Sequence, residues 1–258
     1  MQVWHMSGAG NDFMVIDVRG LNPDLSDLAK KLCAVTHADG LMALDTSSLA
    51  DFKLHFYNSD GSRGEMCGNG ARCICRFAWE MGLAGDAMTA ETDAGLVSGW
   101  RLAENRYRMQ MNLPSIYDRE KKSGTAYIEL GDPGIPHGVV ELDSLDWTDA
   151  ESLRKQAVAL RYDPAFPKGA NISFYTRLSE DTVRVLTYER WVEDYTLACG
   201  TGCTAIGVDL WMQGKLPGGV LTAINKGGDL RVTVIPDGNS ISKLFLEGPV
   251  EIIKIYEL

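Results

Sequence analysis

The spacing of apolar side chains predicts two closely similar helices, one in each half of the chain. Each helix follows a cysteine, and small or apolar residues stand 4, 7, 8 and 11 positions after that cysteine. These residues are Ala71, Ile74, Cys75 and Ala78 after Cys67, and Cys203, Ile206, Gly207 and Leu210 after Cys199. A tryptophan stands at +12 and a glycine at +15 in both copies. This spacing is typical of one apolar stripe along an α-helix that ends at a glycine.

The repeat extends to the segments around these helices. In the first half, a hairpin is predicted at 3–6 and 13–17, followed by a helix at 25–32 and a strand at 52–57. In the second half, the corresponding hairpin is predicted at 127–130 and 138–142, the helix at 153–160 and the strand at 183–188. Further strands are predicted after each cysteine helix, at 87–92 and 107–112, and at 220–225, 230–235 and 243–246. We therefore expect two similar α/β lobes.

The expected lobe boundaries follow from the segments that do not belong to the repeat. Leu113-Pro114-Ser115 reads as the crossover between the lobes. The last predicted strand, 250–256, has no counterpart in the repeat and is expected to return to the first lobe. The expected domains are residues 1–114 plus 247–258, and residues 115–246.

Composition narrows the class of protein. The 258 residues are 45% hydrophobic and 23% charged, as in a globular protein with ample core. A net charge of −10 disfavours nucleic acid or an anionic membrane as a partner. No apolar run reaches the ~18 residues of a membrane span, and the N-terminus lacks the pattern of a signal peptide. Six cysteines are too few for a disulfide scaffold, so a cytoplasmic location is expected.

The repeated phrases Cys67-Gly68-Asn69-Gly70 and Cys199-Gly200-Thr201-Gly202 carry the candidate chemistry. A helix start favours a thiolate, and its amide groups favour a bound carboxylate. The cysteines are 199 − 67 = 132 residues apart, one for each lobe. Two such thiols suit a reaction in which one group removes a proton and another returns one. Taken singly, either phrase is equally compatible with an inert, buried cysteine beside a helix cap.

The chain resembles the diaminopimelate epimerase family over nearly its whole length. Met66-Cys67-Gly68-Asn69-Gly70-Ala71-Arg72-Cys73 and Ala198-Cys199-Gly200-Thr201-Gly202 resemble the two signatures of that family. Gly8-Ala9-Gly10-Asn11-Asp12-Phe13, Asn58-Ser59-Asp60-Gly61-Ser62, Phe166-Pro167-Lys168-Gly169-Ala170-Asn171, Tyr188-Glu189-Arg190 and Gly227-Gly228-Asp229-Leu230 also fit it, in order.

The resemblance implies two pseudo-symmetric lobes, each with strands wrapped as a mixed or antiparallel barrel around a central helix. It also implies an amino-acid racemase or epimerase that works without pyridoxal phosphate, metal or nucleotide. By analogy, Cys67 and Cys199 are the acid/base thiols, and His137 and Glu189 support the proton transfers. The implied substrate-binding residues are Gly68, Asn69, Gly200 and Thr201 at the α-carboxylate, with Asn11, Asn58, Asn171 and Arg190 elsewhere on the substrate. The expected partners are a small amino-acid substrate and, as an option, a second copy of the chain in a homodimer.

Three departures from the family pattern concern the far end of the substrate. Ile135 stands where the family usually has an asparagine, and the loop 189–196 is one residue longer, bulkier and more acidic than usual. The segment 35–40 lacks glycines that are common in the family. A site that hydrogen-bonds a substrate group rejects substrates that lack this group, because its own polar atoms are then left unpaired. The loss of an amide from the site is therefore expected to change the substrate specificity more readily than the reaction type.

Three functions therefore stay open: an epimerase of diaminopimelate, a two-thiol racemase of another amino acid, and a dithiol redox protein. The remaining candidate side chains have simpler readings. We interpret His5, His37 and His55 as surface or satisfied core residues, and Glu193-Asp194 as a solvated loop. The other cysteines, Cys33, Cys73, Cys75 and Cys203, are interpreted as helix-packing thiols.

Overall fold

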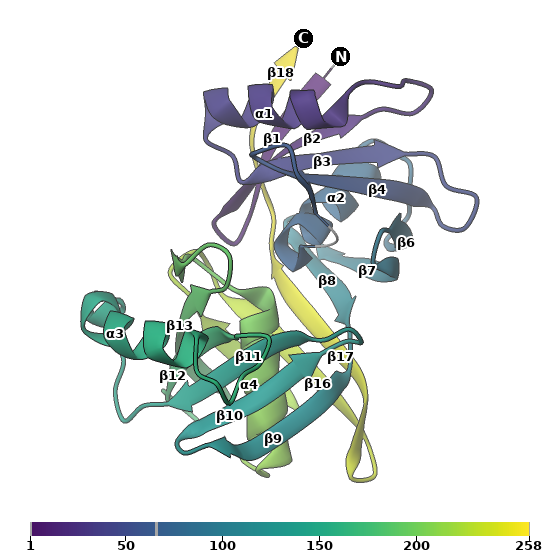
Figure 1. Ribbon diagram of the computed structural model, residues 1–258. Helices are drawn as coiled ribbons and strands as arrows, with labels where there is room; N and C mark the ends of the chain where they lie inside the picture. Colours follow the sequence, from purple (N-terminus) through teal and green to yellow (C-terminus); the bar gives the residue numbers. More distant parts are fainter. Residues whose placement is uncertain (1, 65–66, 258) are drawn as a thin grey trace. The chain divides into compact units, whose positions relative to one another are not determined.

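The computed structural model describes residues 2–64 and 67–257 and divides the chain into two compact units (Figure 1). Unit 1 comprises Met1–Gln110 and Glu247–Leu258, and unit 2 comprises Met111–Leu246. Met66, in the first predicted signature, lies outside the described residues. None of the helices in the described residues has the length and apolar content that crossing a membrane requires.

The strands of unit 1 are connected by a continuous series of pairings. Its elements are β1 (Gln2–Gly8), β2 (Asn11–Asp17), α1 (Leu25–Thr36), β3 (Gly40–Asp45), β4 (Phe52–Asn58), β5 (Arg63–Gly64), α2 (Gly68–Glu80), β6 (Ala87–Thr92), β7 (Gly95–Ala103), β8 (Arg106–Met111) and β18 (Glu251–Glu257). Strand β1 pairs antiparallel with β18 and β2, and β2 pairs parallel with β3. Strand β4 then pairs antiparallel with β3 and parallel with β6, which leads through β7 to β8.

Unit 2 repeats this topology. Its elements are β9 (Pro114–Lys122), β10 (Thr125–Leu130), β11 (Ile135–Glu141), the short 3-10 helix η1 (Trp147–Asp149), α3 (Ala150–Arg161), β12 (Asn171–Arg177), β13 (Thr182–Glu189), β14 (Asp194–Thr196), α4 (Gly200–Met212), β15 (Val220–Ile224), β16 (Leu230–Asp237) and β17 (Ser240–Pro249). Strand β10 pairs antiparallel with β9 and β11, and β11 pairs parallel with β12. Strand β13 pairs antiparallel with β12 and parallel with β15, as β4 does with β3 and β6.

The strand β18 completes unit 1, as the sequence predicted, because it pairs with β1 along nearly its whole length. The prediction that it has no counterpart is wrong, since β9 pairs with β10 in the same way. Leu113-Pro114-Ser115 is also not a simple crossover, because Pro114 is already the first residue of β9. The sequence missed this strand because β9 is largely exposed and charged, so no apolar alternation marks it.

Each unit packs its core around one cysteine helix. In unit 1 the buried face of α2 joins a cluster in which the rings of Trp4 and Phe77 meet edge to face, 5.2 Å between centroids. Helix α4 is buried along most of its length, as expected for a helix that is apolar all round. Burial on all sides fixes the start of each helix relative to the strands of its own unit.

Candidate active site

Cys67 and Cys199 occupy the same structural position in their units. Each is the N-cap residue of a helix and has extended backbone angles, φ −127° and ψ 121° for Cys67 and φ −113° and ψ 107° for Cys199. Neither is one of the residue types whose side-chain oxygen usually caps a helix start. The first amide groups of α2 and α4, including those of Gly68 and Gly200, lie at a helix end that favours an anionic ligand.

The Cys199 thiol is buried, with 4% of the residue exposed. Its Sγ lies 3.6 Å from the hydroxyl of Thr201. Burial raises the pKa of Cys199 well above its usual value, and the nearby charge of Glu189 raises it further, against the opposing hydrogen bonds of Thr201 and the Gly202 amide. Cys199 is therefore a protonated thiol at neutral pH, which is the form that can donate a proton.

The Cys67 side chain is only partly buried and packs against the core cluster of unit 1. It differs in this respect from Cys199. The two helix starts are thus alike in backbone and unlike in the exposure of the thiol.

A chain of polar side chains supports the start of α2. Asn69 is buried; its side-chain amide donates to Oδ1 of Asn11, and its own Oδ1 accepts from Nη2 of Arg72 at 2.8 Å. Asn11 in turn donates to Oδ2 of Asp39 at 3.2 Å. The structure therefore brings together Asn11 and Asn69, two of the predicted substrate-binding residues, through direct contact.

Arg72 and Asp39 were not predicted to have a role. Arg72 is completely buried in α2, and Asp39 also accepts the backbone N–H of Asp12 at 3.0 Å. The sequence does contain a signal for Arg72, which stands among the apolar positions of a predicted helix. A guanidinium that is buried in this way needs a hydrogen-bonding partner, so a polar contact could have been predicted. No comparable signal marked Asp39, whose partners come from another strand.

Asn58 is the last residue of β4 and lies opposite Gly40 of β3. Its side-chain amide donates to Oγ of Ser62 at 2.9 Å, so the structure does not join it to Asn11 or Asn69 directly. The backbone connects the two regions, because the N–H of Ser59 donates to the carbonyl of Asp39.

Three adjacent strands place the candidate residues of unit 2 in one row. His137 on β11 lies opposite Asn171 on β12 in the parallel register. The antiparallel register pairs Ile172 with Tyr188, so Asn171 lies opposite Glu189 at the end of β13. The structure thus brings His137, Asn171 and Glu189 together across neighbouring strands.

His137 is fully buried, and neither ring nitrogen has a hydrogen-bond partner within the described residues. Burial, with a smaller contribution from the positive charge of Arg190, lowers the pKa of His137 to about 3. The ring is therefore neutral across the physiological pH range. A neutral imidazole can both donate and accept a proton, but adds no charge to the site.

Glu189 and Arg190 follow one another at the end of β13. The Thr196 hydroxyl donates to Oε1 of Glu189. The backbone N–H of Arg190 donates to Oδ1 of Asn171 at 2.8 Å, and its Nη1 donates to the carbonyl of Lys168 at 3.0 Å. Nε of Arg190 is buried without a hydrogen-bond partner in the described part of the chain, so this guanidinium can still bind an anion.

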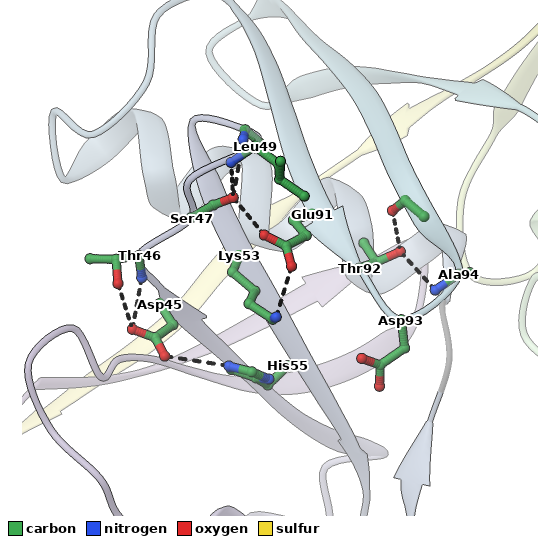
Figure 2. A network of polar contacts seen from close by, with 12 residues as sticks. Asp45, Thr46, Ser47, Leu49, Lys53, His55, Glu91, Thr92, Asp93 and Ala94 are labelled. Atoms are coloured by element: carbon green, nitrogen blue, oxygen red, sulfur yellow. Dashed lines mark hydrogen bonds and ion pairs between the residues drawn. The ribbon is translucent and has the colours of Figure 1, made fainter.

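Two of the three remaining histidines have structural partners. His5 contacts Asp12 at 3.2 Å, and His55 contacts Asp45 at 3.4 Å, in agreement with their simple reading. Figure 2 shows His55 in a polar network of unit 1, in which Lys53 also binds Glu91 at 2.8 Å.

The acidic pair Glu193-Asp194 is not simply a solvated loop. Asp194 is exposed and binds Arg154, but the carboxylate of Glu193 receives the buried guanidinium of Arg161 at 2.8 Å. The prediction is therefore wrong for Glu193. The sequence could not reveal its partner, because Arg161 belongs to a helix 32 positions earlier.

Known structures share this arrangement of strands and helices. A phenazine biosynthesis protein of the PhzF family from Bacillus anthracis matches with a TM-score of 0.72 and 16% identity, over 100% of this chain and 98% of that one. A hydroxyproline epimerase from Agrobacterium vitis matches with a TM-score of 0.71 and 18% identity, over 100% of this chain and 90% of that one. The protein therefore has the two-unit α/β fold of the diaminopimelate-epimerase-like class.

The chain belongs to the diaminopimelate epimerase family, whose model matches residues 3–116 and 131–253. A diaminopimelate epimerase from Aquifex aeolicus is 36% identical, over 100% of this chain and 96% of the relative. Another from Hydrogenobaculum is 34% identical, over 100% and 97%. The protein is accordingly an isomerase of the amino-acid racemase and epimerase type.

Proposed function

We propose that this enzyme converts LL-diaminopimelate to the meso form by inverting one α-carbon, with Cys67 and Cys199 as the two acid/base groups. The observation that carries the proposal is the equivalence of the two helix starts, each headed by a cysteine as the N-cap residue with extended backbone angles. The names of the relatives supply the substrate.

In the proposed reaction, the thiolate of Cys67 removes the α-proton, so that the C–H bond breaks and an S–H bond forms. The buried thiol of Cys199 donates its proton to the opposite face, and the reverse reaction exchanges the two roles. Negative charge that develops on the α-carboxylate is stabilised by the helix-start amides around Gly68, Asn69, Gly200 and Thr201. The raised pKa of Cys199 supports its part as the proton donor in this direction.

The supporting residues have separate parts in the proposal. Neutral His137 and the carboxylate of Glu189 adjust the proton transfers, Glu189 by keeping Cys199 protonated. The substrate's polar groups are read by Asn11, Asn58, Asn171 and Arg190. The homodimer and the cytoplasmic location stay predictions.

A racemase of a different amino acid is the second candidate. Ile135 replaces the usual amide at the start of β11 and is 37% exposed, so it offers an apolar contact. The same two-thiol chemistry would then act on a substrate with an apolar side chain.

Incubation in deuterated water with a panel of amino acids tests these functions. We expect deuterium to enter the α-position of diaminopimelate, and both Cys67→Ser and Cys199→Ser to reduce this exchange at least about a hundredfold, because each removes one proton carrier. Cys203→Ser, which changes a buried thiol inside the second helix, serves as the control. Label in another amino acid alone supports the second candidate. Disulfide reductase activity without any exchange supports the redox protein instead.

A further inference from the structure

The loop 190–193, which joins β13 to β14, adopts an unusual backbone conformation. Trp191 has φ 74° and Glu193 has φ 55°, so two residues with side chains lie in the left-handed region that favours glycine. Such conformations persist only where the surroundings impose them. The side-chain contacts of the loop show what imposes this one.

The carboxylate of Glu193 fastens the loop to the end of α3. Its Oε1 accepts from Nε and Nη2 of Arg161, at 3.1 and 2.8 Å, and from the backbone N–H of Trp191 at 3.1 Å. Its backbone carbonyl accepts from the hydroxyl of Tyr188 at 2.8 Å. One residue thus connects the loop to α3 and to β13.

Arg161 is a firm anchor for this loop. Its side chain is only 6% exposed, and it packs directly on Gly169, where a Cβ atom would lie 2.0 Å from Nη1. Because Gly169 has φ 62° and no side chain, the guanidinium fits against the backbone. The direction of Arg161 is therefore fixed by packing and by its carboxylate partner.

Trp191 interacts with two cations. The guanidinium carbons of Arg190 and Arg161 lie 5.4 and 5.6 Å from the centroid of its ring. Contacts of this length are favourable cation–π interactions. The rest of the indole is open, since Trp191 is 80% exposed.

Arg190 gains its orientation from these neighbours while part of its guanidinium stays available. The carbonyl of Lys168 accepts a hydrogen bond from Nη1 of Arg190, and the ring of Trp191 lies beside the guanidinium. Nε of Arg190 is buried without a hydrogen-bond partner in the part of the chain that the structure describes. Arg161 is a second positive charge nearby, and Glu193 neutralises it. A carboxylate at Arg190 would complete the set of hydrogen bonds.

We propose that Trp191 and Glu193 are positioning residues that hold Arg190 for a carboxylate at the far end of the substrate. This inference rests on the proposed function and adds to it the two residues that fix the direction of Arg190. The bulky, acidic loop then acts on the substrate through Arg190, by stacking and ion pairing.

Calorimetric titration tests the inference without requiring turnover. The ligands are diaminopimelate, as an equilibrated mixture of its LL and meso isomers, and lysine, which lacks the second carboxylate. The variants are Trp191→Leu, Trp191→Phe and Glu193→Ala. Val192→Ala is the matched control, because this side chain is 57% exposed in the same loop.

We expect Trp191→Leu to weaken the binding of diaminopimelate about fivefold, the scale of a partly exposed cation–π contact, and Trp191→Phe to retain most of the affinity. Glu193→Ala should weaken it about tenfold or more, since the loop loses its charge-assisted hydrogen bonds and Arg161 then repels Arg190. The control should bind as the wild type does, and the already weak binding of lysine should not change in any variant.

Three results would overturn the inference. They are a wild-type protein that binds lysine as tightly as diaminopimelate, loop variants that bind diaminopimelate as the wild type does, and loop variants that lose affinity for both ligands equally, as a general structural defect would produce. Deuterium exchange on the same samples separates this outcome from that of the proposed function. Normal exchange with unchanged loop variants refutes only the positioning role, whereas selective binding without exchange refutes only the epimerase reaction.

Discussion

At the scale of single residues, the neutral state of His137 is a property of its surroundings. The side chain is fully buried, without a hydrogen-bond partner among the residues that the structure describes, and the charge of Arg190 adds to the cost of a second proton. A solvent-exposed histidine would be half protonated near pH 6.5. The fold thus keeps His137 uncharged beside a candidate anion-binding arginine.

This state predicts an acid-dependent loss of stability. The folded pKa of about 3 is below the ordinary 6.5, so between these values the unfolded chain binds a proton that the folded chain does not. Stability therefore falls as pH decreases through that window, by about 2 kcal/mol between pH 7 and pH 5 for this one group. Urea denaturation at the two pH values measures it, and His137→Gln should reduce the pH dependence by about this amount. An unchanged pH dependence in the variant would show that another group is responsible.

At the scale of elements, the sequence predicted those strands whose apolar positions alternate or whose place repeats. It missed β3 and β12, whose residues are almost all buried, because a strand covered on both faces lacks the alternating pattern. It also missed β7, whose two glycines and mixed exposure obscure the period. The helices carried a stronger signal, since each repeats its stripe in the other half of the chain.

The residues of the candidate site, like the strands and helices, could be predicted only in part from the sequence. Residues in signature phrases, such as Cys67 and Cys199, could be proposed from their position alone. The partners Asp39 and Arg161 could not, because their roles arise from contacts between elements distant in sequence. Spacing within one element does not predict those contacts.

The close packing of α4 on its sheet makes the start of this helix sensitive to added volume. Gly202 lies in the first turn of α4, where a Cβ atom would be 2.6 Å from Oγ of Ser173 and 3.2 Å from Oγ1 of Thr187. These two hydroxyls are hydrogen-bonded to each other at 3.0 Å, so neither can simply rotate away. The helix start must shift instead, and Cys199 shifts with it.

We therefore expect Gly202→Ala to lower the free energy of unfolding by about 1–3 kcal/mol, as overpacking commonly does, and to slow α-proton exchange. Gly218→Ala is the control, because a Cβ atom there meets nothing within 4 Å. Chemical denaturation and exchange kinetics measure the two effects. Equal stability and activity in both variants would contradict the packing argument.

At the scale of the whole molecule, the two units are completed in different ways. Unit 2 receives its outer strand β9 from the residues directly before β10, whereas unit 1 receives β18 from the end of the chain. The buried guanidinium of Arg76 also binds the carbonyl of Val250, immediately before β18. Unit 1 therefore depends on residues that are far from the rest of it in sequence, and it cannot be completed until β18 is present.

This dependence predicts that removing residues 251–258 destabilises unit 1 selectively. The deletion exposes the backbone groups of β1 that pair with β18, at a cost of about 1 kcal/mol for each ladder hydrogen bond lost. Hydrogen exchange should show amides of β1 and β2 losing at least about tenfold of their protection, while those of β10 to β13 keep theirs. Ile253→Thr, which changes an exposed side chain of β18 and keeps the ladder, should leave both units protected. Equal loss of protection in the two units would instead mean that they unfold as one cooperative body, and the completion of unit 1 by its last strand would then govern the stability of the entire enzyme.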